Sequence, residues 1–401
     1  MALSLAALAV GTAGFASQPL LSPRVRPRHA STYWDDAQRE SEVPAAVLAG
    51  IRKQPWRGGL EPAHDVVPTV LPHAAVRGRI PKDFPTGTLY RNGPGRVRIG
   101  ESLYRHWFDG DGLVSAVSVD REAGTAAYAM RYVNTERYAK QQEPGEYESA
   151  VAGGGMASKC AWTPAKNNAF RPNLLTQPTN PANTAVLALG GKLYALCEGG
   201  PPVEIDARSL ETIDDAPAWA AGLDSFFSAH PKVGVDEPGA LYNFGLSFGA
   251  SSALCVFKLE AAGGAGAPKV VASARFPLER LSFAHDMFLT EKYVIVVLPP
   301  FVCPTAQVVA TAFSGAIGEA LYFDADVGNR VVVLRRDDLS VVADATATPA
   351  AFSYYHGINA YEQADGSIRL QVAAHNGPRV AVEANFKDMC VERTLLLPCD
   401  Y

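Results

Sequence analysis

The sequence has few cysteines, and none of them form close pairs. No Cys-x-x-Cys motif occurs among the six, which are Cys160, Cys197, Cys255, Cys303, Cys390 and Cys399. Zinc ribbons and thiol redox sites depend on closely spaced thiols, so both classes are excluded. We expect these cysteines to be small buried apolar side chains in a reducing compartment.

A surplus of charge of either sign is also missing. The chain has 36 basic and 41 acidic residues, with a net charge of −5. Nucleic-acid binding needs a concentrated basic face, so we expect no nucleic-acid partner. Beyond the first residues, no run approaches the roughly 18 apolar residues that a membrane span requires. Because 48% of the residues are hydrophobic, the chain can bury a sizeable core and is not disordered.

The N-terminus has a composition of its own. Residues 2–16 are small and apolar, and the next stretch carries Arg24, Arg26 and Arg28 with no acidic residue before Asp35. This order is typical of a targeting presequence, which we assign to residues 1–34. Gly14-Phe15 followed by Ala16 resembles the phenylalanine junction of presequences that enter algal complex plastids. We therefore expect plastid (chloroplast) import, with secretion or an untargeted cytoplasmic form as alternatives.

Strand-like runs fill the chain from about residue 60 onward. Val, Leu, Tyr and Phe are concentrated in residues 184–198, 241–260, 292–300, 329–342 and 367–375. Turn residues separate these runs at Asp120–Gly124, Gly190-Gly191, Asp337-Asp338 and Asp365-Gly366. Helical periodicity appears only near residues 35–53, and residues 143–182 have the composition of a long surface excursion. The pattern predicts an all-β chain, either a propeller or paired sandwiches.

Three of the eight histidines have similar surroundings. His230, His285 and His356 each follow aromatic and small residues, in DSFFSAH, RLSFAH and AAFSYYH. They are far apart in the chain, so they belong to different hairpins or blades. Convergence of imidazoles from separate elements would form an all-nitrogen metal site, whereas any one of them alone is as well explained as a core or turn histidine.

Several segments resemble the carotenoid cleavage oxygenase family. They are GTLYRNGPGR (87–96), HWFDGDGLVSAV (106–117), residues 180–213, SAHPKV (228–233), LYNFGLSFG (241–249), FAHDMFLTEKYVIVVLPP (283–300), YYHGINAYE (354–362) and ERTLLLP (392–398). The resemblance runs in register from about residue 60 to the last residues.

This resemblance implies a seven-bladed β-propeller with a dome of helices and loops and an Fe(II) ion near its axis. By the match of motifs, His230, His285 and His356 correspond to the first three of four histidine ligands. Glu198, in ALCEGG, corresponds to an outer glutamate that accepts the second N–H of a ligand histidine. The implied domains are a helical lead-in at 35–60 and the oxygenase propeller at 61–401.

The family's chemistry adds O2 across one C=C bond of a carotenoid or apocarotenoid, giving aldehyde or ketone products. An apolar tunnel would position the polyene, with Phe283, Tyr354 and Tyr355 as candidates for its wall. Peripheral membrane contact is a further expectation, for which residues 294–302 (VIVVLPPFV) are a weak candidate. We expect a monomer.

The sequence departs from the family pattern after His356. Only 45 residues follow it (401 − 356), so the fourth histidine and the closing strands are expected in a missing C-terminal region. His375 does not match the fourth ligand. Three interpretations remain open: a fragment of an iron dioxygenase, a short and inactive propeller that binds apolar ligands, and a stilbene-cleaving relative.

Two other motifs compete with this interpretation. Residues 245–249 (GLSFG) fit the G-x-S-x-G pattern of serine hydrolases, but that nucleophile requires a turn between strand and helix, and the flanking residues predict strand. Residues 109–112 (DGDG) lack the later ligands of a calcium loop and are expected to form a tight hairpin turn.

Overall fold

The computed structural model describes residues 62–71, 78–163, 179–223, 225–234, 236–247, 252–261, 266–279, 281–303, 316–347 and 351–375. This part of the chain is nearly all β, which confirms the predicted class. Its helices are short: η3 (Trp107–Asp109), α3 (Glu136–Lys140), α4 (Glu146–Val151) and η6 (Ile317–Ala320). The residues predicted to form the presequence (1–34) and the helical lead-in (35–60) lie outside the described residues, as do Cys390 and Cys399.

The described strands form four antiparallel sheets of four strands each. The first contains, in spatial order, β1 (Val66–Val70), β6 (Thr125–Tyr132), β5 (Asp111–Asp120) and β2 (Gly87–Arg96). The second contains β10 (Thr212–Asp214), β9 (Val203–Ile205), β8 (Lys192–Leu196) and β7 (Ala185–Leu189). The third contains β11 (Lys232–Val233), β12 (Ala240–Ser247), β13 (Ala253–Ala261) and β14 (Pro268–Pro277). The fourth contains β16 (Phe288–Leu289), β17 (Tyr293–Leu298), β20 (Asn329–Arg335) and β21 (Val341–Ala347).

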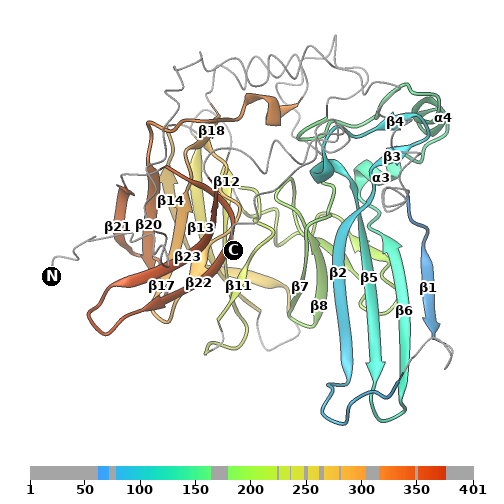
Figure 1. The fold of residues 1–401 in the computed structure, drawn as a ribbon, viewed down its shortest axis with the longest axis horizontal. Helices are drawn as coiled ribbons and strands as arrows, with labels where there is room; N and C mark the ends of the chain where they lie inside the picture. Colours follow the sequence, from blue (N-terminus) through green and yellow to red (C-terminus); the bar gives the residue numbers. More distant parts are fainter. Residues whose placement is uncertain are drawn as a thin grey trace, which may run out of the picture.

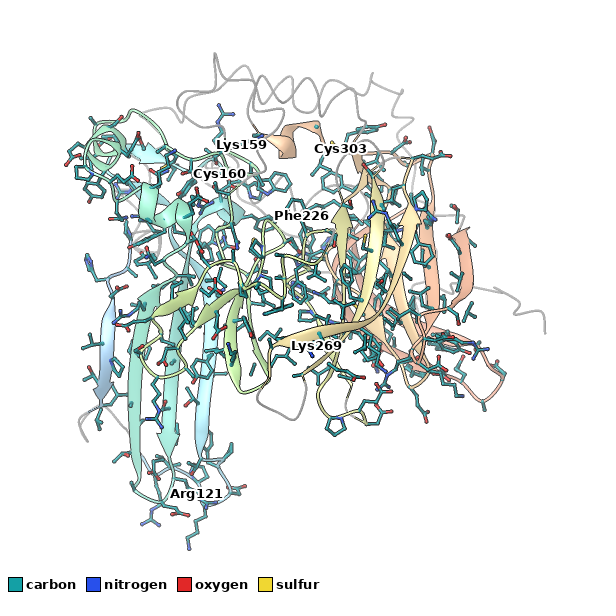
Figure 2. All side chains as sticks on the ribbon, turned by 180° about the vertical axis from the view of Figure 1, so that it is seen from behind. Arg121, Lys159, Cys160, Phe226, Lys269 and Cys303 are labelled. Carbon is teal, nitrogen blue, oxygen red and sulfur yellow. The ribbon has the colours of Figure 1, made fainter. Side chains whose placement is uncertain are left out.

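Smaller sheets complete the described part. They are β15 (Leu281–Ser282) with β18 (Phe301–Cys303) and β19 (Tyr322–Phe323), β22 (Ser353–Glu362) with β23 (Ile368–His375), and β3 (Arg98–Ile99) with β4 (Ser102–Leu103). Figure 1 shows the four-stranded sheets following one another across the molecule in chain order, from the blue and cyan first sheet to the orange strands of the fourth. In Figure 2, Arg121 marks the tip of the β5–β6 hairpin at one end, while Lys159, Cys160 and Cys303 lie at the other.

The predicted turns join these strands. Gly190 and Gly191, with φ of 61° and 76°, link β7 to β8 in a two-residue turn, and Leu189 pairs with Lys192 across it. Positive φ at both central positions suits the right-handed twist of a hairpin, which explains the glycine pair. Gly366, with a φ of 83°, supplies the positive φ in the longer turn between β22 and β23.

The core consists of apolar layers between successive sheets. One cluster joins strands of the first and second sheets, and it includes Val114 and Val203. A second joins the second and third sheets, and a third joins Val256 of β13 to Val296 of β17. Strands between two such layers, such as β12 and β17, are therefore buried along most of their length and have nearly continuous apolar sequences.

Cysteine burial is confirmed within the described residues. Cys160, Cys197, Cys255 and Cys303 are all free and buried. Burial raises the pKa of the Cys197 thiol to about 11, so it stays protonated at neutral pH.

Residues 143–182 match the expected surface excursion only in part, because residues 143–154 are mostly exposed whereas residues 156–163 are buried or half-buried. Residues 146–151 form α4, and the side chains of Met156, Cys160 and Trp162 are buried. The ring of Trp162 stacks on His106 at a centroid distance of 4.5 Å. The polar composition of the segment did not indicate this burial, because only a few large apolar side chains anchor it in the core.

The prediction of a hairpin turn at residues 109–112 was also wrong. Asp109 ends η3 and Asp111 begins β5, and both are buried. Asp111 accepts hydrogen bonds from Arg96 at 2.6 Å and from Arg137 at 2.8 Å. Two guanidinium groups therefore compensate the charge of this buried carboxylate at the start of β5.

The proposed membrane segment at residues 294–302 is not a surface. Its strand β17 pairs with β16 on one side and β20 on the other, and Val294, Val296 and Leu298 are buried. Phe301 and Val302 are buried as well. Its apolar character reflects a central strand covered on both faces. No helix among the described residues is long and apolar enough to cross a bilayer.

Candidate metal centre

Three histidines from three distant segments of the chain meet in space. His230 precedes β11, His285 precedes β16, and His356 lies within β22. One ring nitrogen of each lies within 4.8 Å of the others, and the Nε2 atoms of His230 and His285 are 2.8 Å apart. The ring of His356 is centred 4.9 Å from that of His230 and 5.1 Å from that of His285. The structure thus brings together the three side chains selected from the sequence.

The topology explains why residues so distant in sequence converge. Each of β11, β16 and β22 is the first strand of its sheet and lies at the edge of that sheet. Residues that enter these strands occupy corresponding places in successive sheets. His230 and His285 lie just before their strands and His356 lies near the start of β22, so the three side chains come from corresponding places.

Backbone contacts hold two of the three segments together. The Ser228 hydroxyl donates to the carbonyl oxygen of His285 at 3.2 Å and accepts from the backbone N–H of His230 at 3.2 Å. Ser228 is itself buried, and its carbonyl oxygen accepts from the side chain of Asn243 at 2.9 Å. The segments that carry His230 and His285 are therefore fastened to each other.

The surroundings favour the neutral form of two of the imidazoles, His230 and His356. Burial and the neighbouring His285 lower the pKa of His230 to about 4. The same two causes lower the pKa of His356. A neutral imidazole has a lone pair free for a cation, so these two pKa shifts suit His230 and His356 to act as metal ligands.

Glu198 lies behind the cluster. It follows β8 in a turn, and its carboxylate contacts Nδ1 of His285, on the far side of the ring from the Nε2 that faces His230. A carboxylate at Nδ1 fixes the ring with its proton on that atom and leaves Nε2 as the donor atom. The contact is of the kind that the resemblance implied for Glu198, a carboxylate at the outer nitrogen of a candidate ligand histidine.

The donor set fits a divalent transition metal. Only imidazole nitrogens converge, and an outer carboxylate orients one of them, which suits Fe, Zn, Cu or Ni better than the oxygen-seeking Mg or Ca. Within the described ranges, His230, His285 and His356 are the one group of three or more histidine, cysteine or acidic side chains that could hold a metal. His375 is not part of it, because it pairs with Ser353 at the end of β23.

Aromatic side chains line one side of the cluster. The Tyr355 ring is centred 4.9 Å from that of His285, and the Phe283 ring 6.4 Å from it. Both belong to an apolar cluster that includes Trp162, Phe301 and the partly buried Phe108. This surface is a candidate for contact with a long apolar ligand.

Tyr354 does not share that surface. Successive residues of a strand point to opposite faces, and Tyr354 packs with Phe288 and Phe352 in a different core cluster. Its hydroxyl bonds to the carbonyl oxygens of Asp286 and Val297, each at 3.0 Å. The expectation that Tyr354 is a wall residue was wrong for this reason.

The sequence reasoning missed two groups near the site. Trp162 belongs to a segment that was interpreted as a surface excursion, and no neighbouring residue in the sequence indicates that its ring packs against Phe283. Asp286 directly follows His285 and forms an ion pair with Lys232 at 2.7 Å. The sequence shows that an aspartate follows His285, but Lys232, the ion-pair partner of this aspartate, lies 54 residues earlier in the chain (286 − 232).

The hydrolase-like motif is part of a strand. Gly245, Leu246 and Ser247 lie in β12 and pair with Cys255, Leu254 and Ala253 of β13. A regular antiparallel ladder has no nucleophile turn, as expected. Phe248 and Gly249 are outside the described residues.

Comparison with known proteins agrees with this geometry. The profile of the RPE65 family, described as retinal pigment epithelial membrane protein, matches residues 60–393. The chain is 29% identical over 329 residues to apocarotenoid-15,15'-oxygenase of Synechocystis, covering 78% of this chain and 61% of that protein. It is 27% identical over 327 residues to a chloroplastic 9-cis-epoxycarotenoid dioxygenase of rice, covering 78% of this chain and 48% of the relative.

Solved structures resemble the fold. A variant of Synechocystis apocarotenoid oxygenase superposes with a TM-score of 0.68 at 24% identity, covering 83% of this chain and 66% of that one. A cobalt-substituted form of the same Synechocystis protein gives a TM-score of 0.65 at 25% identity. The chain therefore spans about half to two thirds of the length of these relatives.

Proposed function

The chain belongs to the RPE65 family of carotenoid cleavage oxygenases, and from this premise we propose that it is a non-haem Fe(II) dioxygenase. Its reaction is cleavage of one C=C bond of a carotenoid or apocarotenoid by O2, with both oxygen atoms ending in two carbonyl products. The observation that carries the proposal is the convergence of three imidazoles from three segments that are distant in the sequence.

His230, His285 and His356 are the proposed iron ligands, and Glu198 orients His285. Iron(II) held by neutral ligands keeps a net positive charge and open positions, and it supplies the redox chemistry that O2 requires. The protein's part is to present three Nε or Nδ lone pairs at once. Glu198 contributes by keeping the His285 proton on Nδ1, away from the centre.

Substrate positioning is assigned to the aromatic side of the cluster. Phe283 and Tyr355 adjoin His285, and Trp162 and Phe108 extend the same apolar surface. A conjugated polyene has no polar group along its length, so dispersion contacts and shape must place the reacting bond. The curated relatives act on carotenoids and apocarotenoids according to their names, which supports this class of substrate.

We further propose the architecture and location that the family implies. The sheets described would be blades of a seven-bladed propeller spanning residues 61–401, behind a lead-in at 35–60 and a presequence at 1–34. Layers of apolar side chains between successive sheets support the blade interpretation. The chloroplastic rice relative supports plastid import. A monomer with peripheral membrane contact stays a prediction.

The proposed function is tested by turnover with defined substrates. The chain is reconstituted anaerobically with Fe(II) and then given O2 with β-carotene, an apocarotenal or a hydroxystilbene. We expect aldehyde products from the carotenoid or the apocarotenal, and none from the His285→Ala variant. Cleavage of the stilbene alone would overturn the substrate class, and equal turnover by His285→Ala would overturn the metal centre.

A further inference from the structure

A buried carboxylate lies where the three histidine-bearing segments meet. Asp286 is 2% exposed, and its Oδ1 is 2.7 Å from Nζ of Lys232, two residues beyond His230. Its Oδ2 accepts the backbone N–H of Gly357, the residue after His356, at 2.9 Å. Asp286 itself follows His285. One side chain thus connects all three segments through Lys232 and Gly357, not through the imidazole rings.

We infer that Asp286, paired with Lys232, is a positioning residue that sets the register of the three imidazoles for metal binding. The inference rests on the proposed function, because it assumes that the cluster binds a metal. It concerns a residue distinct from the ligands and from Glu198. Its role is mechanical: it fixes how far the strand with His356 lies from the other two segments.

An irregularity in β22 makes this contact possible. The pairing of β22 with β23 shifts register between Tyr354 and Gly357 and again between Gly357 and Asn359. A β-bulge of this kind re-aims a side chain and removes backbone groups from the regular ladder. Here the bulge contains His356, and the N–H of Gly357 bonds to Asp286 across the gap between sheets.

Gly357 also allows the close approach. A Cβ atom at this position would collide with the ring of Phe288, which is buried at the start of β16. The absence of a side chain therefore lets β22 lie directly against the segment that carries His285. Any larger residue would push the strand, and His356 with it, away from Asp286.

Further contacts complete the frame. The Tyr354 hydroxyl reaches the carbonyl oxygen of Asp286 at 3.0 Å, giving a second bond between β22 and this residue. Ser228 joins the segments of His230 and His285 on the other side. The segment of His285 is consequently linked by polar contacts to each of the other two segments, and the Asp286 side chain takes part in the links to both.

The Lys232 ammonium makes the buried carboxylate tenable. The side chain of Lys232 is 33% exposed and that of Asp286 3% exposed, so the pair reaches water only through the lysine. Removing either partner would leave the other charge or its hydrogen-bond partner uncompensated. The segments would then relax apart, and the imidazoles would no longer converge on one ion.

The test measures metal affinity and ligand geometry. Apo-protein is titrated with Co(II), whose absorption bands report the geometry of its ligands, for the wild type, Asp286→Ala, Asp286→Asn and Lys232→Gln. Groups that orient metal ligands typically change affinity by roughly 10- to 100-fold. We expect at least about a tenfold loss and a changed spectrum for Asp286→Ala, and smaller changes for Asp286→Asn, which keeps an acceptor for Gly357.

Glu204→Gln is the matched control. Glu204 is a buried carboxylate paired with Lys192 at 2.8 Å in the second sheet, remote in topology from the histidine segments. This variant should keep wild-type affinity and spectrum. If Asp286→Ala does not fold, Asp286→Asn and Lys232→Gln decide the result. Unchanged affinity and spectrum in folded Asp286 variants would overturn the inference.

A second measurement separates this inference from the proposed function. Amide hydrogen exchange at Gly357 is followed in the metal-free wild type and in Asp286→Ala. Faster exchange in the variant supports the register role, and equal exchange contradicts it. If the wild type binds no metal at all, the proposed function fails, while the exchange result still shows whether Asp286 holds the strand.

Discussion

Replacing Glu198 offers a graded test of how the centre is organised. Its carboxylate contacts Nδ1 of His285, and the two side chains are 25% and 8% exposed, respectively. Glu198→Gln keeps the shape and an acceptor but removes the charge. Glu198→Ala removes the acceptor as well and leaves Nδ1 of a buried ring without its partner.

The expected magnitudes follow from these losses. A hydrogen bond to a charged group contributes about 1.5–3 kcal/mol and a neutral one about 0.5–1.5 kcal/mol, so Glu198→Gln should weaken metal binding by about 1 kcal/mol, or roughly fivefold. Glu198→Ala adds the penalty of an unpaired buried donor. Since a quarter of Glu198 is exposed, water replaces part of the contact, and about 2 kcal/mol or roughly 30-fold is expected.

The assay is anaerobic competition for Fe(II) between apo-protein and a chelator of known affinity. Circular dichroism on the same samples establishes that each variant is folded. The predicted order of affinity is wild type, then Glu198→Gln, then Glu198→Ala. If folded Glu198→Ala binds Fe(II) as tightly as the wild type, Glu198 does not orient a ligand and the reasoning is refuted.

Three further predictions concern stability. Burial raises the pKa of Asp109 to about 6, above the value near 4 of an unfolded chain. The native state therefore binds this proton more tightly than the unfolded state does. The free energy of unfolding should fall by about 3 kcal/mol as pH rises from about 4 to about 6. Urea unfolding of Asp109→Asn should lack this component, and a pH slope equal to that of the wild type would count against it. The Tyr355 hydroxyl is buried and has no hydrogen-bond partner among the described residues. Tyr355→Phe should therefore leave stability unchanged or raise it by up to about 1 kcal/mol. A clear loss of stability in urea unfolding would contradict this. A Cβ at Gly245 would collide with the carbonyl oxygen of Phe226, so Gly245→Ala should lower the free energy of unfolding by about 3 kcal/mol, measured by thermal unfolding. Gly93 has open space around it, so Gly93→Ala should change stability very little. Similar effects of the two substitutions would disprove the packing argument.

The parts of the fold that the sequence predicted are those encoded by neighbouring residues. Turns such as Gly190-Gly191 are predictable because positive φ at both positions suits glycine. The histidines were identifiable because His230, His285 and His356 share a local context of aromatic and small residues. Local patterns therefore led to the strands and to the candidate ligands.

The errors arose where distant residues decide the environment. The acidic residues at 109–112 looked like a surface turn, but Arg96 and Arg137 bury Asp111 from 15 and 26 residues away. Residues 294–302 looked suited to a membrane surface, yet pairing on both edges of β17 places them in the core. Asp286 gained its role only through Lys232 and Gly357, which no local pattern connects to it.

The metal content of the purified chain tests the central claim most directly. Protein reconstituted anaerobically with Fe(II) and freed of excess metal is analysed by mass spectrometry, alongside alanine variants of His230, His285, His356 and the control His375, which lies outside the cluster. We predict one iron per chain in the wild type and in His375→Ala, and far less in the other three. Iron retained in full by folded His285→Ala, or absent from the wild type, would contradict the three-histidine centre.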